Sequence, residues 1–158
     1  MDTVQQIGEE QLVVFNLANE SYGVEISAVR EIIRLQPITK VPRTPEFVEG
    51  VINLRGKVIP VIDLRRRFGL PSADRSRAGR IVVVEVGDHL LGFIVDRMSE
   101  VLHVPSSQIE PPSPLVTSVN SGYVRGIAKT ENRLIVLLAL EKVLSTAEHD
   151  EVEQIAVA

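Results

Sequence analysis

The feature that most constrains this fold is an internal repeat, because two stretches of the chain occur twice. Residues 12–33 align without gaps on residues 81–102 at a shift of 69, and residues 48–64 align on residues 124–140 at a shift of 76. The identical pairs are Val13/Val82, Val14/Val83, Gly23/Gly92, Glu31/Glu100, Val48/Val124, Gly50/Gly126, Ile59/Ile135 and Leu64/Leu140. The shared order of elements predicts a duplicated folding unit.

Each copy of the repeat is typical of short strands joined by tight turns. Residues 11–17 and 22–26 are rich in β-branched and aromatic side chains, which predicts a hairpin. Residues 50–63 predict a second hairpin, whose turn contains Gly56 because glycine tolerates a positive φ. Pro60 cannot donate a hydrogen bond to a ladder, so we expect its strand at a sheet edge or at a bulge.

Two short segments predict helix rather than strand. Apolar residues from Val29 to Ile33 recur at the three-to-four spacing of a helix, and Ser27 is a suitable cap for a helix over residues 27–33. Residues 64–68 predict one or two helical turns before a Gly-x-Pro stop.

The fold class follows from the size of the repeat. Each copy holds about five short strands and a brief helix in roughly 65 residues, and a unit of that size buries little surface alone. Apolar residues make up 44% of the chain and Trp is absent, so the core is aliphatic. We predict an all-β fold of two small barrels around a shared aliphatic core. Their approximate bounds are residues 10–69 and 80–145, and an exchange of strands between them is left open.

The chain lacks the parts of common catalytic and metal sites. It has no Cys, and its three His are too far apart for a metal pair: His89, His103 and His149. Residues 50–57 do not form a phosphate loop, because five residues separate the glycines and Val58 replaces the required Ser or Thr. Two carboxylate pairs are typical of surface charge, namely Glu49/Asp63 and Asp96/Glu100. We therefore expect no enzyme, no cofactor and no metal.

Charge is spread unevenly along the chain. The net charge is −4, yet residues 65–80 hold six Arg against one Asp. We interpret this stretch as a solvated surface loop. A nucleic-acid-binding barrel would interleave aromatic residues for base stacking, and here only Phe68 is present. Residues 146–158 are an acidic tail outside both copies of the repeat, which we expect to be mobile and dispensable.

The sequence also bears on localisation. No apolar run approaches the ~18 residues that span a bilayer, and the opening residues are not those of a signal peptide. We expect a cytoplasmic protein without membrane insertion.

Three residues suggest a protein-binding surface. Arg55 lies at the predicted hairpin tip, where a guanidinium can bind a carboxylate in bidentate fashion. Val29 and Ile32 contribute an apolar face near a proline-rich segment. The residues alone favour a solvated turn arginine and an ordinary core valine and isoleucine.

The segment from Phe47 to Gly69 (FVEGVINLRGKVIPVIDLRRRFG) closely resembles the signature of the chemotaxis coupling proteins, the CheW family. Residues 12–15, 22–26, 29–33 and 91–96 resemble that family too, so the resemblance runs from about Glu10 to Leu144. It implies two five-stranded SH3-like barrels, in agreement with the repeat.

The resemblance also implies a function. Coupling proteins are non-catalytic scaffolds that link the cytoplasmic tips of methyl-accepting chemoreceptors to the regulatory domain of the histidine kinase CheA in membrane-associated arrays. Carried over by position, the receptor-binding residues are Val29, Gly50, Asn53 and Arg55. The kinase-binding residues are Glu31, Ile32, Ile38 and Thr39.

Alternatives from other classes remain. The same fold occurs as a regulatory domain of larger kinases or in coupling–receiver proteins. The start at Met1 and the absence of kinase and receiver motifs favour a stand-alone adaptor, which we expect to be monomeric. A nucleic-acid-binding barrel and an unrecognised enzyme are the remote alternatives. The resemblance does not distinguish flagellar, pilus and developmental pathways.

Overall fold

The computed structural model describes residues 8–71, 73–112, 121–130, 132–145, 148, 151 and 152. These residues form eleven strands and a few short helices, in agreement with the predicted all-β class. The strands are β1 (Glu9–Leu17), β2 (Glu20–Glu25), β3 (Val29–Arg34), β4 (Val48–Leu54), β5 (Lys57–Asp63), β6 (Arg80–Val86), β7 (His89–Val95), β8 (Arg97–Pro105), β9 (Ile109–Glu110), β10 (Val124–Thr130) and β11 (Arg133–Leu138). The helices are η1 (Ile26–Ala28), α2 (Leu64–Arg67), η2 (Ser106–Gln108), η3 (Ser121–Tyr123) and α3 (Leu140–Val143). None of the described helices is long and apolar enough to cross a membrane.

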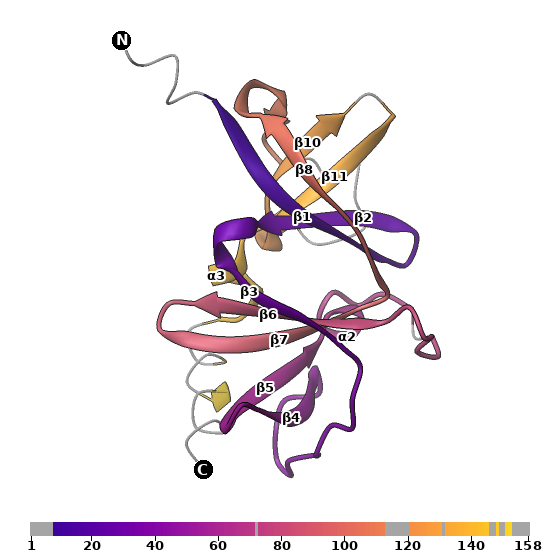
Figure 1. The fold of residues 1–158 in the computed structure, drawn as a ribbon, viewed down its shortest axis with the longest axis vertical. Coiled ribbons are helices and arrows are strands. Elements are labelled where there is room, and N and C mark those ends of the chain that lie inside the picture. Colours follow the sequence, from indigo (N-terminus) through magenta and orange to yellow (C-terminus); the bar gives the residue numbers. More distant parts are fainter. Residues whose placement is uncertain are drawn as a thin grey trace.

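The strands form two sheets that each combine both copies of the repeat. One sheet has the order β8-β1-β2-β11-β10-β9, and the other has the order β3-β6-β7-β5-β4. In Figure 1 the indigo β1 and β2 lie with the later strands in the upper body, while β6 and β7 lie with β3, β4 and β5 in the lower body. The ranges 10–69 and 80–145 therefore correspond to the two copies of the repeat. They do not correspond to the two sheets, because each sheet contains strands from both ranges.

The exchange follows the internal repeat. The antiparallel pair β1–β8 has its counterpart in β6–β3, and the parallel pair β2–β11 has its counterpart in β7–β5. The helices α2 and α3 begin and end at positions that differ by the shift of 76 found in the sequence. The duplicated unit predicted from the sequence is thus present in the fold.

Apolar side chains of the described residues form three clusters, of which the largest lies between the barrels. This central cluster draws on both sheets, for example Phe15 and Tyr22 from one and Val82 and Phe93 from the other. Two smaller clusters fill the barrels, one around Leu12, Val14 and Ile135 and the other around Ile59, Val61 and Ile81. The strands between the central cluster and a barrel interior are buried on both faces. This arrangement explains the unbroken apolar runs of β1 and β6, because successive side chains of a strand point to opposite faces.

The helix predicted over residues 27–33 is wrong, because most of this segment is strand β3. Only residues Ile26–Ala28 form a short 3-10 turn; its N-cap is Glu25, and Ser27 lies inside the turn rather than capping it. From Val29 onward the backbone pairs with β6, where Ile33 lies opposite Ile81. A bulge between Val29 and Glu31 breaks the strand alternation and produces the helix-like spacing of the apolar residues.

The predicted hairpin over residues 50–63 and the helical turn after it are confirmed as β4, β5 and α2. The strand that contains Pro60 does not lie at an edge, because β5 is between β7 and β4. Val51, opposite Pro60, directs its N–H and C=O to Thr39 instead of to β5. The β5–β7 ladder begins only at Val61. Pro60 therefore interrupts neither ladder.

Candidate functional site

All eight predicted binding residues lie on the five-stranded sheet or on the segment that joins β3 to β4. Val29, Glu31 and Ile32 are on β3, Ile38 and Thr39 are on the joining segment, Gly50 and Asn53 are on β4, and Arg55 is in the β4–β5 turn. Thr39 and Val51 exchange two backbone hydrogen bonds of 2.9 and 2.8 Å, so the joining segment is held against β4. The fold thus brings together residues that are up to 26 positions apart in the sequence.

The β4–β5 turn presents Arg55 at its tip. Arg55 and Gly56 have φ of 55° and 83°, as a two-residue type I′ hairpin requires. Asn53 Oδ1 accepts a hydrogen bond of 3.0 Å from the Gly56 N–H, which stabilises the turn. The Arg55 side chain is 78% exposed. Asn53 therefore positions the turn, whereas most of the Arg55 side chain is exposed.

An ion pair connects this turn to strand β3. Arg55 Nη2 lies 3.1 Å from Glu31 Oε1, and the Glu31 side chain is 23% exposed. Arg55 was predicted to bind the receptor and Glu31 the kinase. The structure places these two residues in direct contact, so the two predicted surfaces share a boundary.

Neighbouring residues of β3 point to opposite faces. Glu31 lies opposite Val83, a member of the barrel interior cluster, while Ile32 lies opposite Val82, a member of the central cluster. Since directly opposite residues share a face, Glu31 points to the barrel mouth and Ile32 to the other side. Ile32 is 42% exposed. Val29, on the same face as Ile32 across the bulge, is half-buried against the central cluster.

Gly50 is buried and makes room for the joining segment. It has φ of +152°, and a Cβ added to it would lie 2.2 Å from the Thr39 carbonyl oxygen. Gly126, its counterpart in the repeat, meets the Glu110 carbonyl oxygen in the same way, at 2.8 Å. Gly50 therefore allows Ile38 and Thr39 to lie on β4. The aligned glycines were the sequence signal for this close approach.

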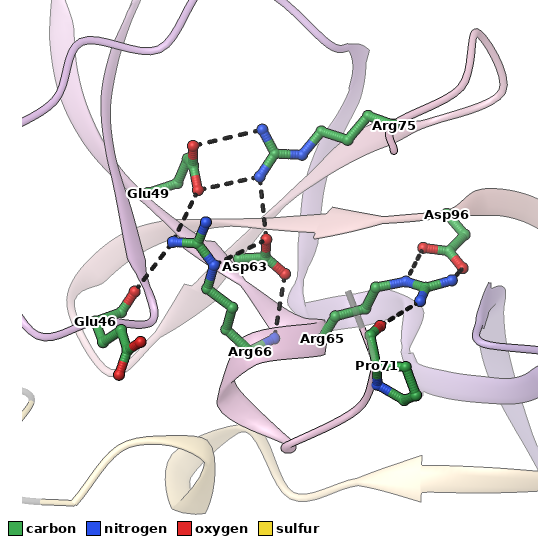
Figure 2. A network of polar contacts seen from close by, with 8 residues as sticks. All are labelled: Glu46, Glu49, Asp63, Arg65, Arg66, Pro71, Arg75 and Asp96. Atoms are coloured by element: carbon green, nitrogen blue, oxygen red, sulfur yellow. Dashed lines mark hydrogen bonds and ion pairs between the residues drawn. The ribbon is translucent and has the colours of Figure 1, made fainter. Parts of the chain in front are cut away.

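The basic stretch from Arg65 to Arg80 includes an exposed loop over residues 73–78, as expected, but several of its guanidiniums are held by carboxylates. Figure 2 shows Arg75 between Glu49 and Asp63, with Nη2 3.1 Å from Glu49 Oε1 and 3.0 Å from Asp63 Oδ2. Arg66 lies 3.5 Å from the same Glu49 oxygen. The hydrogen bond from Arg75 lowers the pKa of Glu49, despite the opposing effect of burial. Glu49 and Asp63 do form a pair, but the arginines neutralise it.

A second ion pair, between Arg65 and Asp96, stabilises one junction between the barrels. Arg65 Nε donates to Asp96 Oδ1 at 2.9 Å, and the Ala18 N–H donates to Asp96 Oδ2 at 2.9 Å (Figure 2 shows the Arg65 contact). Burial raises the pKa of Asp96, but the hydrogen bonds from Arg65 and Ala18 outweigh it and lower the pKa. Asp96 lies in the connection from β7 to β8, so this cluster joins both sheets.

The equivalent junction on the other side lacks that ion pair. By the shifts of 69 and 76, Ser27 replaces Asp96 and Glu141 replaces Arg65. A cleft of about 210 Å³ lies there, which we call the junction cleft; it is lined by Glu25, Ala28, Glu85, Val86, Gly87, Arg125, Leu138, Ala139, Leu140 and Glu141. Val29 directly follows Ala28 in this wall. The repeat is therefore asymmetric at the place where a predicted receptor residue lies.

A second hollow lies beside the Arg55 turn. This turn cavity has a volume of about 410 Å³ and is lined by Gly56, Lys57, Val58, Ile59, Pro60, Asp88, His89, Leu90, Leu91 and Val152. The β6–β7 turn separates the two hollows, since Gly87 lines the cleft and Asp88 lines the cavity. One side of the molecule thus carries the cleft, the cavity and Arg55.

The acidic tail contacts the barrel at its described residues, contrary to our expectation. Arg67 Nη2 lies 2.7 Å from Glu148 Oε1, and Val152 is only 2% exposed. The residues 146, 147, 149, 150 and 153–158 lie outside the described part of the chain. Among the described residues, no group of three or more His, Asp or Glu is arranged to hold a metal.

Comparisons with known proteins agree with these observations. Residues 11–148 match the family model described as the CheW-like domain. The chain is 34% identical to a chemotaxis protein CheW of Klebsiella aerogenes over 96% of this chain and 91% of that protein. It is 37% identical to a chemotaxis protein CheW of Helicobacter pylori, over 89% of this chain and 86% of that protein. The crystal structure of the scaffolding protein TtCheW from Thermoanaerobacter tengcongensis is similar, with a TM-score of 0.82 and 44% identity over 89% of this chain and 90% of that chain.

Proposed function

This chain belongs to the CheW-like family and is a chemotaxis adaptor, and we propose that it links chemoreceptor cytoplasmic tips to the regulatory domain of the kinase CheA. It does so by binding alone, without catalysis. The observation that carries the proposal is the exposed Arg55 guanidinium, which is held at a turn tip and paired with Glu31 of an edge strand. The proposed place of action is the cytoplasmic face of receptor arrays, to which the chain is recruited as a monomer.

The receptor side of the proposal comprises Arg55, Val29 and the hollows between them. An exposed arginine can form a forked, charge-assisted contact with a carboxylate of a receptor helix. Val29 follows Ala28, which lines the junction cleft, and is itself half-buried against the central cluster. Asn53 and Gly50 act indirectly, since Asn53 stabilises the turn and Gly50 accommodates Thr39.

The kinase side comprises the residues of β3 and of the joining segment. Ile32 presents an exposed apolar side chain on β3, and Thr39 is exposed on the joining segment. Ile38 packs partly into the barrel cluster, so it supports this surface from below. Glu31 forms the boundary with the receptor side, because its carboxylate already holds Arg55.

The test is a reconstituted assay with receptor, kinase and this chain. Arg55→Ala should lower receptor affinity by about 2–5 kcal/mol and abolish receptor-dependent kinase activation. Arg55→Lys should restore only part of the activity, since an ammonium does not form a forked contact. Arg133→Ala is the matched control, because Arg133 also pairs with a glutamate, Glu100 at 3.4 Å, but on the other barrel.

The receptor affinity and the kinase activation of these variants together test the proposal. The control should keep full receptor affinity. An Arg55→Ala protein that melts like the wild type and still activates the kinase normally would make Arg55 an ordinary solvated turn residue, and the receptor surface would have to be placed elsewhere.

A further inference from the structure

Two of the six arginines in residues 65–80 form no ion pair with a described residue, whereas the other four each pair with a carboxylate. These two are Arg77 and Arg80. With Arg34 at the end of β3, which has no ion pair among the described residues either, they line one hollow of about 410 Å³. We call this hollow the arginine pocket; its lining consists of Arg34, Leu35, Ser76, Arg77, Gly79 and Arg80. The described wall of the pocket therefore carries three positive charges and no negative one.

Two of these arginines face each other across the sheet. Arg34 lies directly opposite Arg80 in the antiparallel β3–β6 ladder, and like charges in that relationship destabilise a sheet. By the shift of 69, the equivalent pair in the other barrel is Gln11 opposite His103, whose Nε2 atoms lie 3.3 Å apart. The same position in the fold thus accepts a neutral pair whose side chains contact each other. The sheet itself therefore does not require the two arginines.

The loop that enters β6 holds its part of the pocket in place. The Gly79 N–H donates to the Ser76 carbonyl oxygen at 3.0 Å, and a Cβ added to Gly79 would lie 2.6 Å from Leu35 Cδ1. Arg80 Nη1 donates to the carbonyl oxygens of Arg77 and Gly79 at 2.9 and 2.7 Å. Arg80 Nε and Nη2 make no hydrogen bond with a described residue. Two donors of a placed guanidinium are therefore available to a ligand.

The surface beside the pocket is an apolar edge strand. Ile32 precedes Arg34 by two residues in β3, so both lie on the same face, and Ile32 is 42% exposed. β3 ends the five-stranded sheet order, and its outer edge pairs with none of the described strands. An extended segment of another protein can add to such an edge through main-chain hydrogen bonds. The side chains of β3 would then select a segment with an apolar residue near acidic ones.

We propose that the arginine pocket binds the carboxylates of an acidic protein segment that docks in extended form along β3. Guanidiniums bind carboxylates through paired, charge-assisted hydrogen bonds, and a carboxylate would also offset the repulsion between Arg34 and Arg80. A small oxyanion would leave Ile32 uncovered, whereas a segment contacts both Ile32 and the pocket. The pocket rests on the described contacts alone. That the segment belongs to the kinase rests on the proposed function, because Ile32 is on the kinase side.

The experiment uses the full chain labelled with ¹⁵N and three probes. The first is a capped peptide in which an Ile is followed by alternating Asp and Thr, the second has Asn in place of Asp, and the third is inorganic phosphate. We expect the first peptide to shift the side-chain Nε–H resonances of Arg34 and Arg80 and the amide of Gly79 in a saturable way. The second should not, and the affinity of the first should fall as salt rises, because salt screens exposed charges.

The variant is the double substitution Arg34→Gln and Arg80→Gln, which places at the pocket the neutral residue found at Gln11. It should be at least as stable in urea as the wild type, since a like-charge pair is removed. Its affinity for the Asp peptide should fall about five-fold or more, as expected for the loss of two exposed ion pairs. Its affinity for the regulatory domain of the kinase should fall likewise. Arg97→Gln is the matched control, because Arg97 is also exposed and bonds to Asn16 rather than to a carboxylate.

The outcomes separate the pocket from the proposed function. Equal binding of the Asp peptide by the wild type and the double variant, or no saturable shift in the wild type, would overturn the pocket. Phosphate binding as tight as that of the Asp peptide would overturn the segment and leave a site for small oxyanions. Lost peptide binding with unchanged kinase affinity would overturn the assignment of the segment to the kinase. If the wild type fails to bind the kinase at all, the proposed function fails, and the peptide titrations alone decide whether the pocket binds carboxylates.

Discussion

Arg55 Nη2 lies 3.1 Å from Glu31 Oε1, and this contact joins the β4–β5 turn to the edge strand β3. The two residues are 24 positions apart in the sequence: Glu31 is on β3 and Arg55 directly follows β4, the two strands at opposite ends of the five-stranded sheet order. The ion pair therefore helps to close the barrel mouth. It also means that a change at either residue alters the surface presented by the other.

A double-mutant cycle on this pair should give a small coupling energy for folding. Exposed ion pairs contribute about 0–1 kcal/mol, so Glu31→Ala, Arg55→Ala and the double variant should unfold in urea within about 1 kcal/mol of each other. Arg55→Gly is an informative control, since the φ of 55° suits glycine. It should be as stable as the wild type yet lose receptor binding. A coupling energy well above 2 kcal/mol would assign the pair to folding.

Gly50→Ala should destabilise the protein strongly. The new Cβ would lie 2.2 Å from the Thr39 carbonyl oxygen, and the backbone of Thr39 would have to move. We expect a loss of about 2–4 kcal/mol in the free energy of unfolding, as for other overpacked or strained sites. Gly69→Ala is the matched control, because Gly69 also has a positive φ, 70°, but nothing lies within 4 Å of its added Cβ. Equal losses in both variants would refute the close-approach explanation.

Glu49 should make stability depend on pH in the acid range. Its folded-state pKa is lowered from 4.5 by the Arg75 hydrogen bond, so its contribution is present above pH 4.5 and is lost as the pH falls through the folded-state value. Glu49→Gln should lower the free energy of unfolding by roughly 1 kcal/mol at pH 7, and by progressively less below pH 4.5. Urea titrations from pH 7 to pH 3 measure this difference. Glu46→Gln, at an exposed neighbouring position, is the control for the loss of one carboxylate near this cluster.

Truncation after Ser145 should lower the melting temperature. It removes the buried Val152 side chain and leaves Arg67 without the carboxylate of Glu148. Burial of a valine side chain is worth about 1.5–3 kcal/mol, and each kcal/mol corresponds to about 2–4 °C for a domain of this size. Calorimetry on the truncated chain should therefore show a loss of several degrees. An unchanged melting temperature would restore the expectation of a dispensable tail.

Local backbone structure could be predicted from the sequence wherever neighbouring residues decide the conformation. The turn at Arg55-Gly56 followed from the one residue type that readily adopts a positive φ, and α2 followed from a short periodic stretch before Gly69. The duplicated unit was visible because equivalent strands have the same pattern of burial. For example, β4 and β10 both begin with a buried valine and reach a buried glycine two residues later.

Contacts between residues far apart in the sequence could not be predicted in the same way. The segment from Val29 to Arg34 is a strand because β6, about 50 residues away, provides a ladder, and the bulge in this pairing gives its apolar residues a helix-like spacing. The arginines from Arg65 to Arg75 found carboxylates in other elements, at Asp96 and Glu49. A list of charges predicts exposure, but only the fold decides which opposite charges lie within hydrogen-bonding distance.

The all-β class, the duplication, the family and most strand positions could thus be predicted from the amino-acid sequence, since these follow from residue type, spacing and period. Three features became known from the folded structure: the two copies exchange strands, Arg55 contacts Glu31, and Glu148 and Val152 hold the tail against the barrel. The reason is physical. Each of these contacts joins residues that are distant in the chain, and its free energy depends on the distance and burial that packing creates rather than on the residues alone.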